Sequence, residues 1–417
     1  MTNEAQSNAT GAGAYNANIS RYYAYMFVEG FQLWLPIWVA YLQQMRGLTL
    51  TQITLLDAPF WIAIILAEVP TGAVADRWGR KHSLILGSLS FSLAIFLFGV
   101  GTEFWILLAS YLVWAVSMAL QSGADTAFLY DSLAAMGRES EFRKVTGRAN
   151  AINIVGNLIG SLIGAPLAAA TNLAVPILVS AALTLGAAAV LLTVREPARR
   201  LDAPRLPYFQ VMREAAAFMR HHPTLPAMVA LRAALMGAGM AGFIFTQPFL
   251  ALYDVPLESY GLLSIPARLA SIGAALIAYR LVAPVGERRL FMLLAVGFVA
   301  SYAVLGMVDS VWAFPIFGAL AACNSLTRPL SADYITRHSP QHMRATLMSM
   351  AQMAMSVTLL AAEPGMGALA DRTSLQTTFL AAAVGVGVIA ALALAAWTAA
   401  ERTQRKRATL AEAAGVR

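Results

Sequence analysis

Long apolar stretches separated by short polar segments recur along almost the whole chain. A helix that spans a bilayer needs about 20 consecutive, mostly apolar residues. Stretches of this kind cover residues 21–45, 53–76, 82–101, 104–133, 145–170, 173–194, 224–253, 258–282, 288–308, 311–337, 342–368 and 374–399. The pattern predicts an all-α membrane protein with twelve transmembrane helices.

The composition favours the same class of protein. Hydrophobic residues make up 59% of the 417 residues and charged residues 12%, whereas a soluble domain carries about 25% charged residues. The first twenty residues are polar and lack the basic start and the apolar run of a cleavable signal peptide. We expect them to form a flexible tail.

The basic residues are distributed unevenly between the two sides of these spans. Most of the 29 Lys and Arg residues fall on one side, and only Arg46 and Arg372 fall on the other. Because basic loops stay on the cytoplasmic side of a membrane, both chain termini are predicted to be cytoplasmic. The same distribution explains the net charge of +7 without a nucleic-acid partner.

The longest connector, residues 195–223, divides the predicted spans six and six. Its stretch 208–220 is amphipathic and is expected to lie in the membrane interface as a short helix, with an ordinary soluble connector as the alternative. The predicted organisation is a flexible cytoplasmic tail (1–20), a first six-helix bundle (21–194), a cytoplasmic linker with an amphipathic helix (195–223), a second six-helix bundle (224–399) and a basic cytoplasmic tail (400–417).

Weak internal similarity relates the two halves. Tyr130-Asp131 precedes Arg143 in the first half, and Asp333-Tyr334 precedes Arg344 at a similar spacing in the second. Parallel repeats related by an axis along the membrane normal occur in secondary transporters. We therefore predict two pseudo-symmetric bundles.

The most informative segment is a basic turn between the second and third apolar stretches, Gly72-Ala-Val-Ala-Asp-Arg-Trp-Gly-Arg-Lys81. So much charge cannot lie in the hydrocarbon core, so the turn must lie at a membrane surface. The pattern Gly-x-x-x-Asp-Arg-x-Gly-Arg-Lys resembles the signature loop between helices 2 and 3 of the major facilitator superfamily.

The resemblance covers the chain after residue 20 and implies the major facilitator fold of two six-helix bundles. It also implies a conformational latch, in which the charge of Asp76 faces the positive N-terminus of a helix of the other half. A plain topology anchor is the alternative, although an anchor needs neither the aspartate nor the glycines. The predicted latch residues are Gly72, Asp76, Arg77, Gly79, Arg80 and Lys81.

Small residues recur every four positions in the fifth apolar stretch, at Gly156, Gly160 and Gly164, and Pro166 follows them. Such a stripe lets another helix approach closely, so we predict helix packing through these residues. The stretch resembles the glycine–proline motif in helix 5 of drug–proton antiporters of the superfamily, from which it departs at Ser161.

Charged residues inside apolar spans are costly and mark functional candidates. Glu29 and Asp125 are assigned either to proton coupling, because burial favours the neutral form of a carboxyl group, or to ion pairs between the halves. Glu363 is a further acid within a span. Charged residues nearer the span ends are assigned to gating or helix capping, namely Glu68, Asp131, Asp333 and Arg344.

Three arginines, Arg232, Arg268 and Arg328, lie inside spans of the second half. They are predicted either to hold an anionic group of a substrate, which a guanidinium fork suits, or to neutralise acids of the first half. Drug antiporters of the superfamily usually carry an arginine shortly before a Gln-Gly pair in helix 4. Here Gln121 follows Met-Ala-Leu, so the resemblance does not extend to that proton relay.

The resemblance places spans 1, 4, 7 and 10 around a central cavity. Aromatic side chains suit a cavity for apolar ligands, although they also occur in ordinary cores and at membrane interfaces. The predicted cavity residues are Tyr25, Trp34, Gln121, Arg232, Phe245, Gln247, Arg268, Asn324 and Arg328.

The sequence offers no enzymatic or metal chemistry. A single cysteine, Cys323, excludes a disulfide framework, and the five histidines form no metal-binding pattern. We find no phosphate-binding loop, dinucleotide fingerprint or nucleophile elbow. No enzyme activity, metal or cofactor is predicted, and a proton gradient is the expected driving force.

These features and the resemblance predict a secondary transporter that works by alternating access in a bacterial cytoplasmic (inner) membrane. The first hypothesis is proton-coupled export of a small, largely apolar or amphipathic compound. The alternatives are uptake or export of an anionic metabolite or metal chelate, and a non-transporting membrane receptor or scaffold. The expected partners are a small-molecule substrate and the lipid bilayer, and the protein is expected to be a monomer that binds no nucleic acid.

Overall fold

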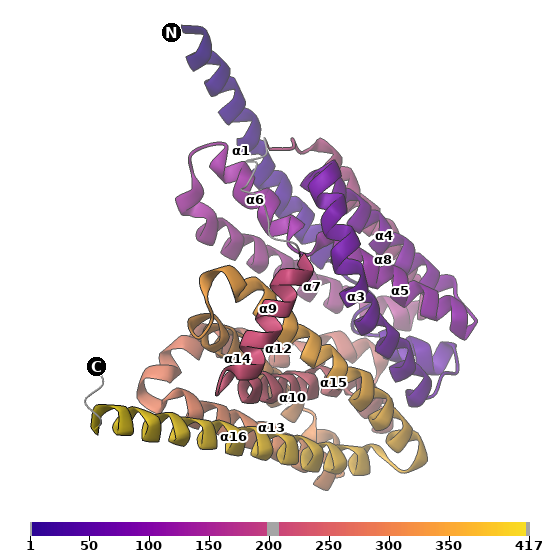
Figure 1. The fold of residues 1–417 in the computed structure, drawn as a ribbon. Helices are drawn as coiled ribbons and strands as arrows, with labels where there is room; N and C mark the ends of the chain where they lie inside the picture. Colours follow the sequence, from indigo (N-terminus) through magenta and orange to yellow (C-terminus); the bar gives the residue numbers. More distant parts are fainter. Residues whose placement is uncertain (1, 198–207, 414–417) are drawn as a thin grey trace. The chain divides into compact units, whose positions relative to one another are not determined.

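The computed structural model describes residues 2–197 and 208–413, and every regular element in this part of the chain is a helix (Figure 1). The first half contains α1 (Thr2–Gly30), α2 (Trp38–Ala40), η1 (Tyr41–Met45), α3 (Leu50–Trp78), α4 (Arg80–Val100), α5 (Phe104–Gln121), α6 (Ala124–Ala134), η2 (Glu139–Glu141), α7 (Phe142–Ala170) and α8 (Ala174–Thr193). The second half contains α9 (Tyr208–His221), α10 (Leu225–Ile244), α11 (Thr246–Leu252), η3 (Leu257–Ser259), α12 (Tyr260–Val285), α13 (Glu287–Met307), η4 (Val311–Ala313), α14 (Ile316–Arg337), η5 (Gln341–Met343), α15 (Arg344–Arg372) and α16 (Leu375–Ala413).

Ten segments of the described residues are long and apolar enough to cross a membrane. Two further long helices, α1 and α14, are more polar. The first twenty residues reduce the apolar character of α1, and Asn324, Arg328 and Asp333 interrupt that of α14. With these two helices the described chain makes the twelve predicted passes, and the predicted all-α fold is confirmed.

The chain forms two compact units. Residues 1–48, 55–201 and 254–264 form the first unit, and residues 49–54, 202–253 and 265–417 form the second. The main division thus falls inside the predicted linker. Two short segments differ from the predicted bundles, because the first turn of α3 belongs to the second unit and the start of α12 belongs to the first.

One core cluster of the first unit is built from residues of α1, α4, α6, α7 and α8. Tyr22, Leu84, Phe128 and Leu191 are at most 2% exposed and belong to one apolar cluster. The rings of Tyr22 and Phe128 stack with their centroids 6.5 Å apart. This cluster fixes α1 against α4, the helix that begins in the signature loop.

The glycine stripe of α7 lies against the end of α1 and the irregular residues 31–37 that follow it. A Cβ atom at Gly156 would lie 2.5 Å from the Phe27 carbonyl oxygen. A Cβ atom at Gly164 would overlap the carbonyl group of Leu33. The backbones of the two segments are therefore in direct contact.

The core of the second unit is aromatic. Phe317 packs against Phe249 and Phe379, with ring centroids 5.4 Å and 5.9 Å away. Tyr302, which is fully buried, also packs against Phe379, with ring centroids 6.1 Å apart. These rings join α11, α13, α14 and α16 into one unit.

Helices extend into both predicted tails. Helix α1 begins at Thr2, and Asn18, within the stretch predicted to be flexible, is only 1% exposed. Its side-chain amide is hydrogen-bonded to Ser132 and to the Arg195 carbonyl oxygen within the first unit. Helix α16 continues through the basic tail to Ala413.

The predicted amphipathic helix of the linker is present as α9. Its residues Ala215 and Met219 are buried, at 0% and 8% exposure. Helix α9 therefore packs by its apolar face onto the second unit. Residues 198–207 of the predicted linker lie outside the described residues.

Candidate functional site

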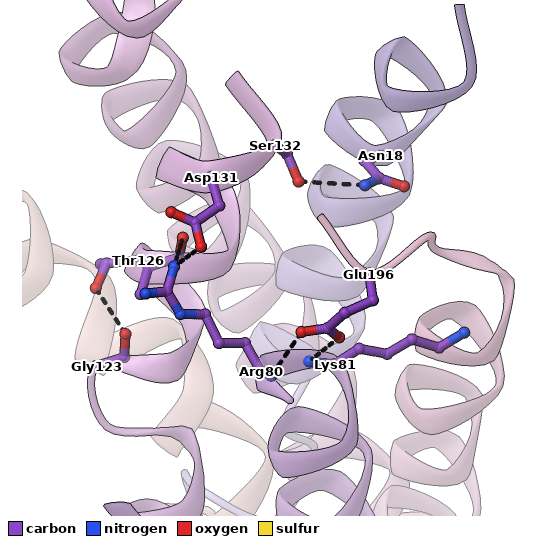
Figure 2. Close-up of polar contacts among 9 residues, drawn as sticks. Asn18, Arg80, Lys81, Gly123, Thr126, Asp131, Ser132 and Glu196 are labelled. Atoms are coloured by element: carbon purple, nitrogen blue, oxygen red, sulfur yellow. Dashed lines mark hydrogen bonds and ion pairs between the residues drawn. The ribbon is translucent and has the colours of Figure 1, made fainter. Parts of the chain in front are cut away.

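The signature loop is held inside the first unit by Glu196, which follows α8 (Figure 2). The Glu196 carboxylate accepts the backbone N–H groups of Arg80 and Lys81 at 2.8 Å each, so it caps the positive N-terminus of α4. Gly79 precedes this turn with φ of 104°, a conformation that favours glycine. A Cβ atom at Gly79 would also lie only 2.8 Å from Glu196 Oε1.

Lys81 makes the reciprocal contact with the end of α8. Its Nζ donates to the carbonyl oxygens of Leu192 and Val194 at 2.9 Å and 2.8 Å. Cations are favoured at helix C-termini, where carbonyl groups lack partners within the helix. The start of α4 and the end of α8 are therefore joined twice, by the Glu196 carboxylate and by the Lys81 ammonium group.

Arg80 connects the loop to α6 (Figure 2). Its guanidinium pairs with the carboxylate of Asp131 and donates to the Ala127 carbonyl oxygen at 2.8 Å. The ion pair is largely shielded, because the side chains retain 29% and 19% of their exposure. Asp131, predicted to gate or to cap a helix, is thus the partner of a signature-loop arginine.

Asn18 of α1 completes this network and was missed by the sequence reasoning. Its Nδ2 donates to Ser132 Oγ at 3.2 Å (Figure 2). The same Nδ2 donates to the Arg195 carbonyl oxygen at 2.9 Å, and Asn18 Oδ1 accepts the Arg195 N–H at 3.0 Å. Glu196 was missed as well. Both are polar residues next to an apolar stretch, which is a weak signal when their partners are far away in the sequence.

The remaining latch residues lie at the end of α3. Asp76 and Arg77 are exposed, and no described atom outside the helix lies within 4 Å of a Cβ atom placed at Gly72. Of the predicted latch residues, Gly79, Arg80 and Lys81 join the contacts with α6 and α8. The pairing of Asp76 with a helix of the other half stays a prediction.

The second unit contains a related cluster with exchanged charges. Gly286 precedes α13 with φ of 79°, as Gly79 precedes α4. Arg288 Nη1 then pairs with Glu401 Oε2 at 3.0 Å, and Glu287 pairs with Arg337 at the end of α14. Helix α4 thus begins with the basic Arg80, which pairs with an acid. The corresponding helix α13 begins with the acidic Glu287, which pairs with a base.

The predicted gating or capping residues differ in exposure and in position along their helices. Asp333 is exposed and pairs with Arg337 at 2.8 Å. Arg344 is exposed and donates to the Ser339 carbonyl oxygen at 3.4 Å. Glu68 is partly buried near the middle of α3. Asp333 and Arg344 thus lie near helix ends, and the gating or capping role of this group stays a prediction.

A polar cluster lies in the interior of the first unit. Tyr25 Oη of α1 donates to Gln121 Oε1 at 3.0 Å, and Gln121 Nε2 donates to Ser117 Oγ at 3.3 Å. One turn along α1 from Tyr25, Glu29 Oε1 accepts a hydrogen bond from Ser88 Oγ of α4 at 2.8 Å. The predicted residues Tyr25, Glu29 and Gln121 are therefore brought together.

Asp125 lies in the first turn of α6 beside this cluster. Gly123, with φ of 72°, breaks the fourth span between α5 and α6 and so creates a helix N-terminus within it. Asp125 Oδ1 accepts the Thr126 N–H at 2.6 Å. Tyr25 is 2% exposed and lies within electrostatic range of both Asp125 and Glu29.

Two predicted cavity aromatics lie in packed cores instead. Trp34 is 3% exposed and meets Trp114 edge-on at 5.5 Å. Phe245 is fully buried and packs against Phe379 at 6.1 Å. A ring that fits an apolar ligand fits an apolar core equally well, so the sequence did not separate the two environments.

The arginines of the second unit lie on neighbouring helices. Arg232 of α10 is 3% exposed, and it donates to Ser331 Oγ at 3.1 Å and to the Ala351 carbonyl oxygen at 3.0 Å. Arg328 of α14 is exposed and lies within electrostatic range of Arg232. Neither guanidinium forms an ion pair with a described residue.

Further polar residues of the predicted cavity lie in the same unit. Asn324 is one helical turn before Arg328, and its buried Oδ1 has no hydrogen-bond partner among the described residues. Gln247 of α11 is 6% exposed, and Arg268 of α12 is partly buried. The polar residues of the predicted cavity thus include both buried and partly buried side chains of the second unit.

Two acids are almost completely withdrawn from solvent. Glu363 of α15 is 1% exposed, and Asp57 of α3 is 8% exposed. Asp57 was missed by the sequence reasoning, although an acid inside the second apolar stretch is a detectable signal. Within the described residues, no group of three or more His, Cys, Asp or Glu side chains could hold a metal ion.

A histidine caps the N-terminus of α10. His222 Nδ1 accepts the N–H groups of Thr224 and Leu225 at 3.3 Å and 3.2 Å. Burial and the nearby ring of His338 lower the pKa of His222 from its ordinary value. The neutral ring that this cap requires is therefore favoured at neutral pH.

Curated relatives match part of the chain. Multidrug resistance protein 2 of Bacillus subtilis is 31% identical over 127 residues, which are 30% of this chain and 32% of that protein. Quinolone resistance protein NorA of Staphylococcus aureus is 26% identical over 132 residues, which are 32% and 34% of the two chains. The chain thus matches about a third of the length of these relatives.

Solved structures of transporters share the fold over nearly the whole chain. The nucleoside transporter NupG has a TM-score of 0.76 at 14% identity and covers 91% of this chain and 98% of its own. A bacterial homologue of the human lysosomal transporter Spinster has a TM-score of 0.68 at 16% identity and covers 96% and 98%. The family model of the Major Facilitator Superfamily matches residues 23–354 and 269–416. The chain therefore belongs to the Major Facilitator Superfamily and is a membrane transporter rather than an enzyme.

Proposed function

We propose that this protein exports a small, largely apolar or amphipathic compound in exchange for protons, by alternating access. The observation that carries the proposal is the polar cluster of the first unit, in which Tyr25 lies within electrostatic range of two acids, Glu29 and Asp125. The two curated relatives are named for multidrug resistance and quinolone resistance, which supports export of such compounds.

The cluster offers what a proton carrier needs. Glu29 is partly withdrawn from water, which favours a neutral carboxyl group, while the Ser88 hydroxyl donates to it and stabilises the anion. Burial and this hydrogen bond therefore act on Glu29 in opposite directions. The hydrogen bond from Tyr25 to Gln121 fixes the Tyr25 side chain, which lies one turn from Glu29 on α1.

We infer the orientation from the charges. The end of the first unit that carries the signature loop is basic, and we place this end in the cytoplasm. Both termini are then cytoplasmic, and the membrane is the inner membrane of a bacterium. Asp76 acts in this proposal as a latch on the cytoplasmic side, and the transporter acts as a monomer.

Neutral isosteres of the two acids test proton coupling. In proteoliposomes with an imposed pH gradient, Glu29→Gln and Asp125→Asn are each expected to reduce gradient-driven transport of ethidium and similar amphipathic dyes at least about tenfold, because the carrier site no longer exchanges a proton. Thermal unfolding should change little.

Glu103→Gln is the matched control, since Glu103 is an exposed acid at the start of α5. Gradient-driven dye transport that stays normal in both acid variants would refute the coupling assignment. Transport lost equally in the Glu103→Gln control would show that the effect is not specific to the cluster.

A second function is favoured by the arginines of the second unit. Arg232 is buried and its guanidinium donates only to uncharged groups. Arg328 is exposed and lies within electrostatic range of Arg232. Neither arginine forms an ion pair with a described residue. Two cations that lack a carboxylate partner suit an anionic solute, which a guanidinium binds with paired donors. The solute would be an organic anion or an anionic metal chelate.

Binding measurements separate this function from drug export. For the purified protein, we expect Arg328→Met to weaken binding of a responding mono- or dicarboxylate about tenfold or more, because a charge-assisted contact is lost. Arg289→Met, which removes an exposed arginine at the start of α13, should leave the affinity unchanged. Equal affinity in the two variants would exclude Arg328 as an anion ligand.

A further inference from the structure

Asp371, at the C-terminal end of α15, binds the first turn of α3. Its Oδ1 accepts the Leu50 N–H at 3.0 Å, and its Oδ2 accepts the Thr51 N–H at 2.7 Å and the Thr51 hydroxyl at 2.6 Å. All three residues belong to the second unit, whereas α3 continues from Leu55 into the first. One carboxylate thus satisfies two backbone donors at a helix N-terminus, where negative charge is favoured.

The same turn also has a side-chain cap of its own. Thr49 Oγ1 accepts the Gln52 N–H at 3.2 Å, and Gln52 Oε1 accepts the Thr49 N–H at 3.0 Å. This reciprocal pair is a capping box, which defines a helix start without help from distant residues. The bonds to Asp371 are therefore additional, and α3 can lose them without unwinding.

Gly367, one turn before Asp371, brings the two helices into backbone contact. A Cβ atom there would lie 2.7 Å from the Leu50 carbonyl oxygen and would overlap Thr54 Oγ1. Thr54 is fully buried as a result, although its hydroxyl bonds only to carbonyl groups of its own helix, at 2.8 Å and 3.0 Å. Close packing and charge therefore act on the same few residues.

We propose that Asp371 is a functional residue of the transport cycle, a releasable latch at the end of the protein opposite the signature loop. The bonds described here are its closed state. Opening of this end for release or entry of the substrate breaks them, while the capping box preserves the helix start. The inference rests on the proposed alternating access, and with the basic end in the cytoplasm this latch is the extracellular one.

The latch also explains a relation between the two ends of α3. The signature motif implies that Asp76, at the C-terminal end of α3, faces a helix N-terminus. Asp371, at the C-terminal end of α15, faces the N-terminus of α3. An acid at each end would then hold the closed state of that end, so that one latch opens while the other closes.

Thiol labelling of the purified protein tests the latch. Thr54→Cys in a Cys323→Ser background places one reactive thiol under the contact, and its reaction with a maleimide should be slow. Asp371→Ala should accelerate the labelling about tenfold, which corresponds to a loss of roughly 1.4 kcal/mol from the closed state. Gly367→Val should accelerate it as well, because the added atoms separate the helices.

Arg372→Ala is the matched control, since Arg372 is the exposed neighbour of Asp371 in the same helix; it should leave the labelling rate unchanged. A normal labelling rate in Asp371→Ala would overturn the proposal. Faster labelling accompanied by a loss of helical circular dichroism would overturn it too, since Asp371 would then only stabilise the fold. The assay uses neither substrate nor pH gradient, so its outcome is independent of dye transport.

Discussion

Replacement of Gly164 by leucine is expected to leave little or no folded transporter. A Cβ atom at Gly164 already overlaps the Leu33 carbonyl group, and a leucine adds three more carbon atoms. The Leu33 segment cannot move away freely, because its N–H donates to Ser180 Oγ of α8 at 3.0 Å. Overpacking of a close contact costs about 1–3 kcal/mol, and more where backbone must shift, so we expect a loss of at least about 3 kcal/mol.

The measurement is the yield of monodisperse protein after detergent extraction, together with its thermal unfolding. Gly147→Leu is the matched control, because Gly147 lies on the same helix and a Cβ atom there meets no described atom within 4 Å. Gly160→Ala should have an intermediate effect, since its Cβ atom would lie 2.8 Å from the backbone nitrogen of Gln32. Equal stability of Gly164→Leu and Gly147→Leu would show that the stripe is not a packing surface.

Reversal of the charge at Arg80 is expected to have the second-largest effect. Arg80→Glu would place a carboxylate beside Asp131 and near Glu196, and it would remove the donor to the Ala127 carbonyl oxygen. Breaking a fully buried pair costs about 3–5 kcal/mol. The pair retains 29% and 19% exposure, so we expect about 2–3 kcal/mol and a thermal midpoint lower by several degrees.

Exchange of the two charges provides the rescue. The double variant Arg80→Glu/Asp131→Arg should regain part of the lost stability, as the charge-exchanged pair Glu287–Arg337 of the second unit shows that this polarity is sterically feasible at a comparable turn. Arg77→Glu is the control for net charge, because Arg77 is exposed. An Arg77→Glu variant as unstable as Arg80→Glu would refute the specific pairing.

The fold was predictable because its main signals are local. Span length, the basic turn and the four-residue glycine spacing can all be recognised within about 30 consecutive residues, and they located the helices and the signature loop. The resemblance then grouped Tyr25, Gln121 and Asp125 in one region. The same logic predicted Glu29 as a partly buried acid.

The contacts that hold these elements are not local. Glu196 binds the start of α4 across more than 100 residues, and Asp371 binds the start of α3 across more than 300. A single carboxylate beside an apolar stretch gives no sign of such a partner. Trp34 and Phe245 illustrate a second limit, because burial in a core and exposure to a cavity select the same residue types.

The assignment of residues 49–54 to the second unit has a consequence for attempts to divide the protein. A cut through the connector separates Asp371 from the turn that it caps, because Leu50 and Thr51 then remain on the other fragment. Residues 208–413 expressed alone would carry an uncompensated carboxylate beside Gly367. The halves are therefore better studied as co-expressed complementing fragments than as autonomous pieces.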